Sequence, residues 1–289
     1  MLSIKSLNKK YADGTQALRD VNLELPTGMI GLLGPNGAGK STLMRTLACL
    51  QSSDSGSITF GSIDIAEQPM ALRKQLGYLP QYFGVYPNMS CRALLQHMAV
   101  LKGITDNHKR QDQIENLIAL TNLTEVANKK VTAFSGGMRQ RFGIAQALLG
   151  SPNILVMDEP TAGLDPVERQ RLHNVLVNIS QDKLVLLSTH IVEDIENLCS
   201  HAAIMMNGHI VGSDSIHALI ADLADKVWQT TQKPEDSDAI LSMTHYMGQS
   251  RYRVLSKHRP SADAQKVQAS LQDRYFLELA KQGYDNAVA

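Results

Sequence analysis

Long hydrophobic runs are missing from this sequence. Apolar stretches such as MIGLL (29–33) and ILVM (154–157) fall far short of the roughly 20 residues that a membrane-spanning helix needs. The opening residues, MLSIKSLNKK, contain no apolar segment of the kind that a secretory signal carries. We therefore expect a chain that does not span a membrane itself and that needs a partner to act on one.

Cysteine and unbalanced charge are also scarce. The three cysteines, Cys49, Cys91 and Cys199, lie far apart without metal-site spacing, which favours a reduced compartment and no structural metal. Cys49 and Cys91 fall in helical patterns and are expected to be small buried hydrophobic residues. The 28 Lys and Arg residues balance 28 Asp and Glu residues and are spread along the chain, so we expect no nucleic-acid partner.

The sequence does contain an alternation of strand-like and helix-like segments. Strands are predicted at 21–25, 29–33, 153–157, 184–188 and 202–206, and helices at 40–49, at 135–149, after Pro166 and after His190. Strands separated by helices predict a largely parallel sheet with helices on both faces. The fold class is therefore α/β, and 289 residues suit one large domain with a small appendage.

A hairpin and a helical insert interrupt this alternation. Residues 53–64 predict a hairpin strand, so that the N-terminal part forms an antiparallel β subdomain. Residues 82–134 predict a helical insert, because Leu94, Met98 and Leu101 recur at helical spacing after a Ser90 cap. The apolar residues Ile114, Leu117 and Ile118 repeat that spacing.

The last part of the chain changes character again. A polar linker-like segment at 230–238 is followed by a predicted strand at 251–256 and a predicted helix at 262–281. We expect a main domain at 1–220 and a small α+β accessory domain at 221–289.

A glycine-rich loop gives the most specific signal. Residues 34–41, GPNGAGKS, fit G-x-x-x-x-G-K-[ST] between a predicted strand and a predicted helix, a pattern expected by chance in about one sequence in 100 of this length. The expected phosphate-binding set is Gly34, Pro35, Asn36, Gly37, Ala38, Gly39, Lys40, Ser41 and Thr42. Backbone N–H groups and the helix dipole would hold phosphates, Lys40 would reach the β- and γ-phosphates, and the Ser41 hydroxyl would bind Mg²⁺. The sequence thus predicts a P-loop NTPase.

Polar residues follow the predicted strands where the phosphate loop also lies. Asp158 and Glu159 end the strand ILVM, so Asp158 could hold Mg²⁺ through water while Glu159 accepts a proton from the attacking water or orients it. The alternative for these two is a pair of solvated loop acids. His190 follows the strand LVLLST, at the edge where ligands bind such sheets, and could hydrogen-bond the γ-phosphate or fix the geometry of the attacking water.

Two further residues could complete the site. The Gln81 amide could reach the metal ion or the water, and the Tyr11 ring could stack on adenine. Taken alone, Gln81 would be a surface glutamine, His190 a turn residue and Tyr11 an ordinary strand aromatic. Their assignments depend on the phosphate loop.

A second turn that suits an anion lies at FSGG. Ser135, Gly136 and Gly137 begin a predicted helix with a hydroxyl and exposed N–H groups. In isolation this would be a simple helix cap. The helical insert separates it from the loop at 34–41, so we expect it to close over the phosphate loop of a second copy packed head to tail.

The ordered series GPNGAGKST, Gln81, FSGGM, ILVMDEP, GLD and STH resembles the ATP-binding subunits of ABC transporters over residues 2–215. The resemblance implies that two subunits dimerise around two ATP molecules, with Ser135, Gly136 and Gly137 clasping the ATP of the opposing subunit. Asp165 would belong to a loop that crosses the dimer interface. The insert and the loop after Gln81 would dock an integral membrane permease. The segment FSGGM (134–138) corresponds to the signature loop of this family. In it, Phe134 replaces the usual leucine, and Met138 replaces the usual glutamine and so removes a polar side chain near the opposing nucleotide.

Finer similarity points to bacterial ABC-2-type exporters with a separate permease, on the segments 81–95, 141–152 and 163–171. That resemblance implies an ATPase held by its permease at the cytoplasmic face of the inner membrane. One chain contains both halves of a nucleotide site, the phosphate loop and the turn at Ser135, which favours a homodimer. Short C-terminal appendages of this branch support dimer contacts, although RYFLEL (274–279) could be ordinary core. The alternatives are a soluble ABC-type ATPase acting on ribosomes or DNA and a non-catalytic scaffold that binds nucleotide.

Overall fold

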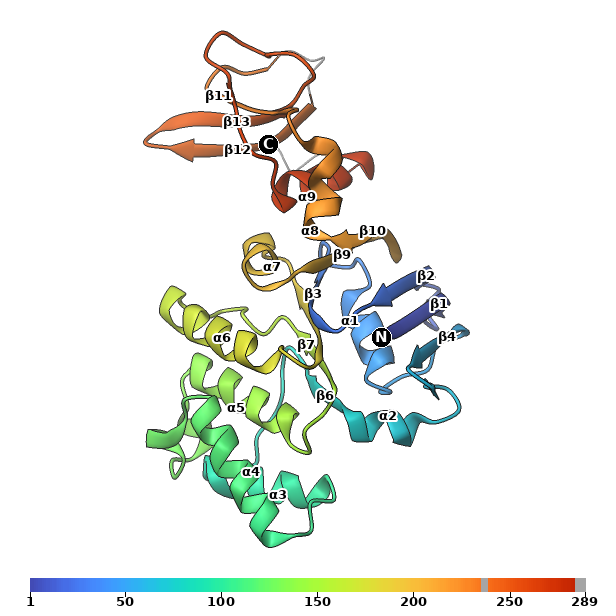
Figure 1. Ribbon diagram of the computed structural model, residues 1–289, viewed down its shortest axis with the longest axis vertical. Coiled ribbons are helices and arrows are strands. Elements are labelled where there is room, and N and C mark those ends of the chain that lie inside the picture. Colours follow the sequence, from blue (N-terminus) through green and yellow to red (C-terminus); the bar gives the residue numbers. More distant parts are fainter. Residues whose placement is uncertain (235–238, 284–289) are drawn as a thin grey trace.

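A computed structural model describes residues 1–234 and 239–283 and contains three β-sheets (Figure 1). The central sheet has the order β10-β9-β3-β8-β7-β6. Its strands are β3 (Gly28–Leu33), β6 (Leu76–Leu79), β7 (Ile154–Asp158), β8 (Leu184–Thr189), β9 (His201–Met206) and β10 (His209–Ser215). All neighbours from β6 to β9 pair in parallel, and only β10 is antiparallel to its neighbour. The predicted α/β class and largely parallel sheet are confirmed.

The central strands are apolar because both of their faces are covered. Every residue of β7 and β8 is buried, as expected for parallel strands that are covered on both faces. The register aligns Asp158 with Ser188 and Leu33 with Thr189. The last residues of β3, β7 and β8 therefore lie at one edge of the sheet.

An antiparallel sheet of order β2-β1-β4-β5 covers one side (Figure 1). It consists of β1 (Leu2–Lys10), β2 (Gln16–Leu25), β4 (Ser55–Phe60) and β5 (Ile63–Asp64). Helix α1 (Lys40–Leu47) shares one hydrophobic cluster with both sheets, and its Leu43 and Met44 are completely buried. The helix that follows the phosphate loop is thus fixed between two sheets. Helix α2 (Pro69–Gln75) leads from β5 to β6.

Helices lie on the other side of the central sheet. They are α3 (Cys91–Leu101), α4 (Asn107–Leu120), α5 (Gly136–Leu148), α6 (Pro166–Ile179) and α7 (Val192–Leu198), with 3₁₀ turns at Thr124–Val126 and Val131–Ala133. Of these, α5 and α7 contact the strands of the sheet, whereas α3 and α4 pack against each other and on α5. The Ser90 hydroxyl accepts a hydrogen bond from the Ala93 N–H and caps α3, as predicted. No helix of the described ranges combines the length and apolarity that a bilayer crossing requires.

The helix predicted from Leu94, Met98 and Leu101 is confirmed as α3, but these residues are not equally buried. Leu94 is fully buried, whereas Leu101 is 69% exposed. The buried residues of α3 are Cys91, Leu94, Leu95 and Ala99. Leu101 is the last residue of the helix, so it lies beyond the stripe that packs on the neighbouring helices. Helical spacing alone does not show where that packing stops.

The predicted α1 helix was also too long, because it ends at Leu47 and Cys49 adopts a left-handed backbone with φ of 55°. Cys49 is half-buried, while Cys91 and Cys199 are buried, and all three thiols are free. Burial raises the pKa of the Cys91 thiol to about 11 and that of Cys199 to about 12. Cys91 is thus the small buried residue expected, and Cys49 instead ends a helix.

The C-terminal segment forms a third sheet, of order β12-β13-β11-β14. Its elements are α8 (Ile216–Ile220), a 3₁₀ turn (Ala221–Leu223), β11 (Val227–Thr230), β12 (Ala239–Tyr246), β13 (Gln249–Leu255), β14 (Gln265–Lys266) and α9 (Leu271–Lys281). The predicted strand at 251–256 is confirmed. Residues 235–238 of the predicted linker lie outside the described ranges.

Helix α9 begins nine residues later than the predicted start at 262, because Ser270 and Asp273 form a capping box. Before it, Gln265–Lys266 pair with β11 instead. Leu271, Tyr275 and Leu279 of α9 join the same hydrophobic cluster as Ile195 of α7. The alternative that RYFLEL is ordinary core is therefore correct for its buried residues. The domain boundary near 220 stays a prediction.

Replacing Leu94 or Leu101 by alanine tests which residues of α3 pack in the core. We expect Leu94→Ala to lower the free energy of unfolding by about 2–5 kcal/mol, because it leaves a cavity in the core. Leu101→Ala serves as the matched control and should change it by less than about 0.5 kcal/mol. Urea unfolding followed by circular dichroism measures both, and equal losses would contradict the assignment.

Candidate active site

The phosphate loop at 34–39 joins β3 to α1, and close backbone contacts require glycine at two of its positions, Gly34 and Gly39. A Cβ at Gly34 would lie 2.3 Å from the carbonyl oxygen of Met205, and one at Gly39 would lie 2.4 Å from that of Ala17. Gly39 also has φ of 106°, which L-residues rarely adopt. No side chain caps α1, so its first N–H groups face the loop and can receive an anion.

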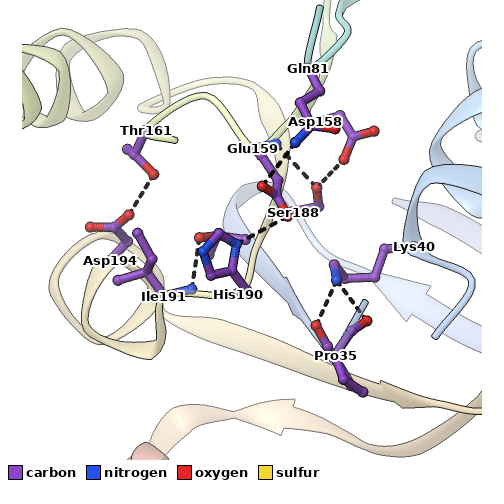
Figure 2. A network of polar contacts seen from close by, with 12 residues as sticks. Pro35, Lys40, Gln81, Asp158, Glu159, Thr161, Ser188, His190, Ile191 and Asp194 are labelled. Carbon is purple, nitrogen blue, oxygen red and sulfur yellow. Dashed lines mark hydrogen bonds and ion pairs between the residues drawn. The ribbon is translucent and has the colours of Figure 1, made fainter. Parts of the chain in front are cut away.

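Lys40 is the first residue of α1, and its side chain bends back over this loop. Its side chain is buried, and Nζ donates to the carbonyl oxygens of Gly34 at 2.6 Å and Pro35 at 3.1 Å (Figure 2). Burial lowers the pKa of the Lys40 ammonium, and the nearby carboxylates of Glu159 and Asp158 oppose that shift. A phosphate would compete with the two carbonyls for this ammonium and would supply it with a full negative charge.

Asp158 is held at the end of β7 by a neighbour on β8. The carboxylate is buried, and its Oδ1 accepts a hydrogen bond of 2.5 Å from Ser188 Oγ. The pairing follows from the register that aligns these two residues. Ser188 was not among the predicted site residues, although it lies two positions before His190. A hydroxyl at the end of an apolar strand carries no motif of its own.

Glu159 is the centre of the site. Its backbone has φ of 50°, and its N–H donates to the Ser188 carbonyl oxygen at 3.0 Å. Gln81 Nε2 donates to Glu159 Oε2 at 3.2 Å, and His190 Nδ1 lies 3.1 Å from Oε1 (Figure 2). The glutamate side chain is 11% exposed, whereas that of His190 is 52% exposed. Gln81 and His190, which come from separate segments, therefore meet at the Glu159 carboxylate.

This arrangement suits proton transfer to or from a water molecule. The carboxylate of Glu159 is oriented from both sides, and it lies at the same sheet edge as the loop that contains Lys40. A positioned carboxylate that is fixed by neighbours can act as a general base. This edge of the sheet thus brings together the Glu159 carboxylate, the Lys40 ammonium and the first N–H groups of α1.

Tyr11 lies beside the first turn of α1. Its hydroxyl lies 3.2 Å from Thr42 Oγ1 and donates to Gln51 Oε1 at 3.2 Å. Ser41 lies in the same turn and is half-buried. These contacts place Tyr11 next to the phosphate loop, and its role in stacking on a base stays a prediction.

The turn at Ser135 lies elsewhere. The Ser135 hydroxyl accepts from the Met138 N–H and caps α5, and Figure 1 shows α5 and α1 apart, with the central strands between them. A Cβ at Gly137 would lie 2.2 Å from a carboxylate oxygen of Glu168, which also pairs with Arg141 at 3.0 Å. Gly136 has open space around it.

Asp165 caps the neighbouring helix α6 by accepting from the Glu168 N–H at 2.8 Å. It belongs to the loop that follows Glu159, and it contacts the backbone of its own chain. Its expected part in a dimer interface stays a prediction.

A buried polar cluster behind Glu159 was missed by sequence reasoning. Asp194 of α7 accepts a hydrogen bond of 2.6 Å from Thr161 Oγ1, and its other oxygen lies 3.1 Å from His173 Nε2. All three residues are buried. The sequence signal for this cluster is Asp194, an acid at an inward-facing position of the helical segment IVEDIENL. Such positions are usually apolar.

Comparison with known proteins agrees with these observations. Residues 18–162 match the family described as ABC transporter. The chain is 38% identical to the uncharacterized ABC transporter ATP-binding protein YxlF of Bacillus subtilis, over 73% of this chain and 69% of that protein. It is 34% identical to the Nod factor export ATP-binding protein I of Cupriavidus pinatubonensis, over 76% and 68%. A solved ATP-binding subunit of an ABC transporter superposes with a TM-score of 0.68 at 26% identity, over 77% and 92%.

Substituting the loop lysine tests the phosphate cradle. We expect Lys40→Ala to weaken the binding of ATP by about 10- to 100-fold, because one charge-assisted hydrogen bond contributes about 1.5–3 kcal/mol. Lys74→Ala, at an exposed position of α2, is the matched control and should bind as the unaltered chain does. Isothermal titration calorimetry gives both dissociation constants, and an unchanged value for Lys40→Ala would refute the role of the lysine.

Proposed function

Since this chain belongs to the ABC transporter family of ATP-binding proteins, we propose that it hydrolyses ATP between two copies of itself and thereby drives a separate membrane permease. ATP is the nucleotide of this family. We also propose which residues carry the reaction, which metal ion takes part, how the subunits pair and in which direction transport runs.

The observation that carries the proposal is the environment of Glu159. Its carboxylate lies between Gln81 and His190, at the sheet edge that also holds the phosphate loop and Asp158. In the proposed reaction Glu159 orients or deprotonates the attacking water. Gln81 and His190 keep the carboxylate pointed at that water, while Lys40 and the N–H groups of the loop hold the phosphates.

The donor set near the phosphate loop fits Mg²⁺. Ser41 offers a hydroxyl, Asp158 a buried carboxylate and Gln81 an amide oxygen, which are the hard oxygen ligands that Mg²⁺ prefers. The described residues contain no cluster of three acidic, histidine or cysteine ligands. This agrees with an ion that shares its coordination with phosphates and water. When bound, Mg²⁺ would neutralise charge on the β- and γ-phosphates.

The turn at Ser135 supports a site made from two chains. It begins α5 with a capping hydroxyl and open space at Gly136, and α5 lies apart from α1 (Figure 1). A second copy arranged head to tail would bring this turn over the ATP held by the first copy's loop. Asp165 would then lie at the interface between the copies. Closure would complete each hydrolytic site and exclude bulk water.

The proposed membrane partner follows from the family and from the exposed segment after Gln81. Tyr82 is 84% exposed and Tyr86 is 51% exposed, next to the helical region that begins with α3. We assign this surface to the permease, which would hold the chain at the cytoplasmic face of the membrane. A relative of this chain is named for Nod factor export, and export is the direction that we propose here.

The glutamate test separates hydrolysis from binding. We expect Glu159→Gln to bind ATP within about twofold of the unaltered chain but to lower turnover by about 10²- to 10⁴-fold, because the amide cannot accept the proton. A closed, ATP-bound dimer should accumulate and be seen by size-exclusion chromatography. Glu125→Gln, at an exposed position, is the control. Normal turnover in Glu159→Gln would remove the proposed role.

A bulky cation at the second turn tests the two-chain site. Ser135→Arg should leave ATP binding to the single chain unchanged and lower turnover at least about tenfold, since the side chain would fill the space meant for the opposing nucleotide. Combined with Glu159→Gln, it should also prevent the closed dimer from accumulating. Ser62→Arg, on an exposed turn, is the control. A turnover rate equal to that of the control would sink the argument for closure in trans.

A further inference from the structure

The buried cluster around Asp194 joins the two chain segments that carry Glu159 and His190. Asp194 and Thr161 are each 1% exposed, and His173 is 8% exposed. Figure 2 shows the Thr161 hydroxyl directed at the Asp194 carboxylate, beside the contact between Glu159 and His190. None of the reactions proposed above uses this carboxylate directly.

The positions of these residues along the chain explain the connection. Thr161 lies two residues after Glu159, in a turn that the Ala162 N–H closes by donating to the Glu159 carbonyl oxygen at 3.2 Å. Asp194 lies four residues after His190, and its N–H donates to the Ile191 carbonyl oxygen at 3.2 Å. The Thr161–Asp194 hydrogen bond of 2.6 Å therefore ties the turn of one residue to the helix of the other.

Glu159 needs such support because its backbone is strained. A φ of 50° is uncommon for a residue with a side chain, and it persists only where the surroundings hold it. On one side the Glu159 N–H is fixed by the Ser188 carbonyl oxygen. On the other side the chain continues to Thr161, whose hydroxyl is held by Asp194. His190 itself is half-exposed and offers only one side-chain contact to Glu159.

Helix α6 holds the same carboxylate from a third direction. His173 Nε2 lies 3.1 Å from Asp194 Oδ1, and Arg169 Nε lies 4.0 Å from the same oxygen. Both residues belong to the helix that Asp165 caps. Asp194 thus connects the turn after Glu159, the helix after His190 and the helix that begins at the expected dimer interface.

We propose that Asp194 is a positioning residue for hydrolysis, which acts through Thr161 to hold Glu159 and His190 at their mutual distance. The inference rests on the proposed role of Glu159. A displacement of about 1 Å at a reacting group lowers rates by about 100-fold, so a network that limits smaller displacements affects turnover without touching the nucleotide. Its loss lowers the turnover number and leaves the affinity for ATP unchanged.

Thr161→Val is the primary test, because valine keeps the volume and removes the hydroxyl. We expect its kcat for ATP hydrolysis to fall about tenfold while KM and the dissociation constant for ATP stay within about twofold. Thr161→Ser retains the hydroxyl and should restore kcat to within about twofold of the unaltered chain. The measurement uses the full chain with Mg²⁺-ATP and a phosphate-release assay.

Thr121→Val is the matched structural control. Thr121 is also completely buried, and its hydroxyl donates to the Leu117 carbonyl oxygen at 2.7 Å at the C-terminal end of α4. Removing it deletes another buried threonine hydrogen bond away from Glu159, although its acceptor is a backbone carbonyl and not a carboxylate. We expect both valine variants to lower the melting temperature, with normal kcat for Thr121→Val only.

A double-mutant comparison tests whether Asp194 acts through Thr161. Asp194→Ala should lower kcat at least as much as Thr161→Val, and adding Thr161→Val to it should cause no further loss, because both remove one contact. Equal kcat in Thr161→Val and the unaltered chain would overturn the inference, as would equal losses in Thr161→Val and Thr121→Val. Glu159→Gln is assayed alongside. If it also turned over normally, the proposed hydrolytic role would fail, whereas loss in Glu159→Gln alone would leave that role intact.

Discussion

The parallel register of β3, β8 and β7 is the constraint on which the site depends. It aligns Asp158 with Ser188 and brings Leu33, the last residue before the phosphate loop, level with Thr189. Because parallel strands end at the same edge, residues from distant parts of the chain become neighbours without any long side chain reaching across the fold. The hydrogen bond from Ser188 to Asp158 and the one from the Glu159 N–H to Ser188 both follow from this alignment. A register shift of a single residue would separate all of them.

The sequence predicts this site well where the information is local. The phosphate loop, the Ser90 cap and the ends of β7 and β8 are each specified by a few consecutive residues, and the structure places Gln81, Glu159 and His190 together as expected. Predictions from periodicity alone were less accurate. Leu101 has helical spacing but lies exposed at the end of α3. Residues 262–270 have a helix-like sequence, but the helix begins only after the Ser270 cap. Ser188, Thr161 and Asp194 escaped notice because their importance comes from tertiary neighbours on other strands and helices.

The glycine at position 137 lies in the proposed second anion site and also has a role in packing within this chain. Any side chain there would displace the Glu168 carboxylate, which pairs with the buried Arg141 and with Arg171 at 2.6 Å. The pair with Arg141 connects α5 with α6, whereas the pair with Arg171 lies within α6, so the turn at Ser135 and the loop at Asp165 are fixed to each other within one chain. A second subunit would therefore meet both as one preformed surface. The packing of this chain alone therefore favours glycine at position 137.

Helix α7 is enclosed from two sides. One side holds Asp194 against Thr161, and the other packs Ile195 among Leu271 and Tyr275 of α9, where Glu196 also accepts a hydrogen bond of 2.5 Å from the Leu271 N–H. The C-terminal helix α9 therefore packs against the seven-residue helix that follows His190. Through α7, the C-terminal segment and the sheet edge that holds Glu159 share one continuous core.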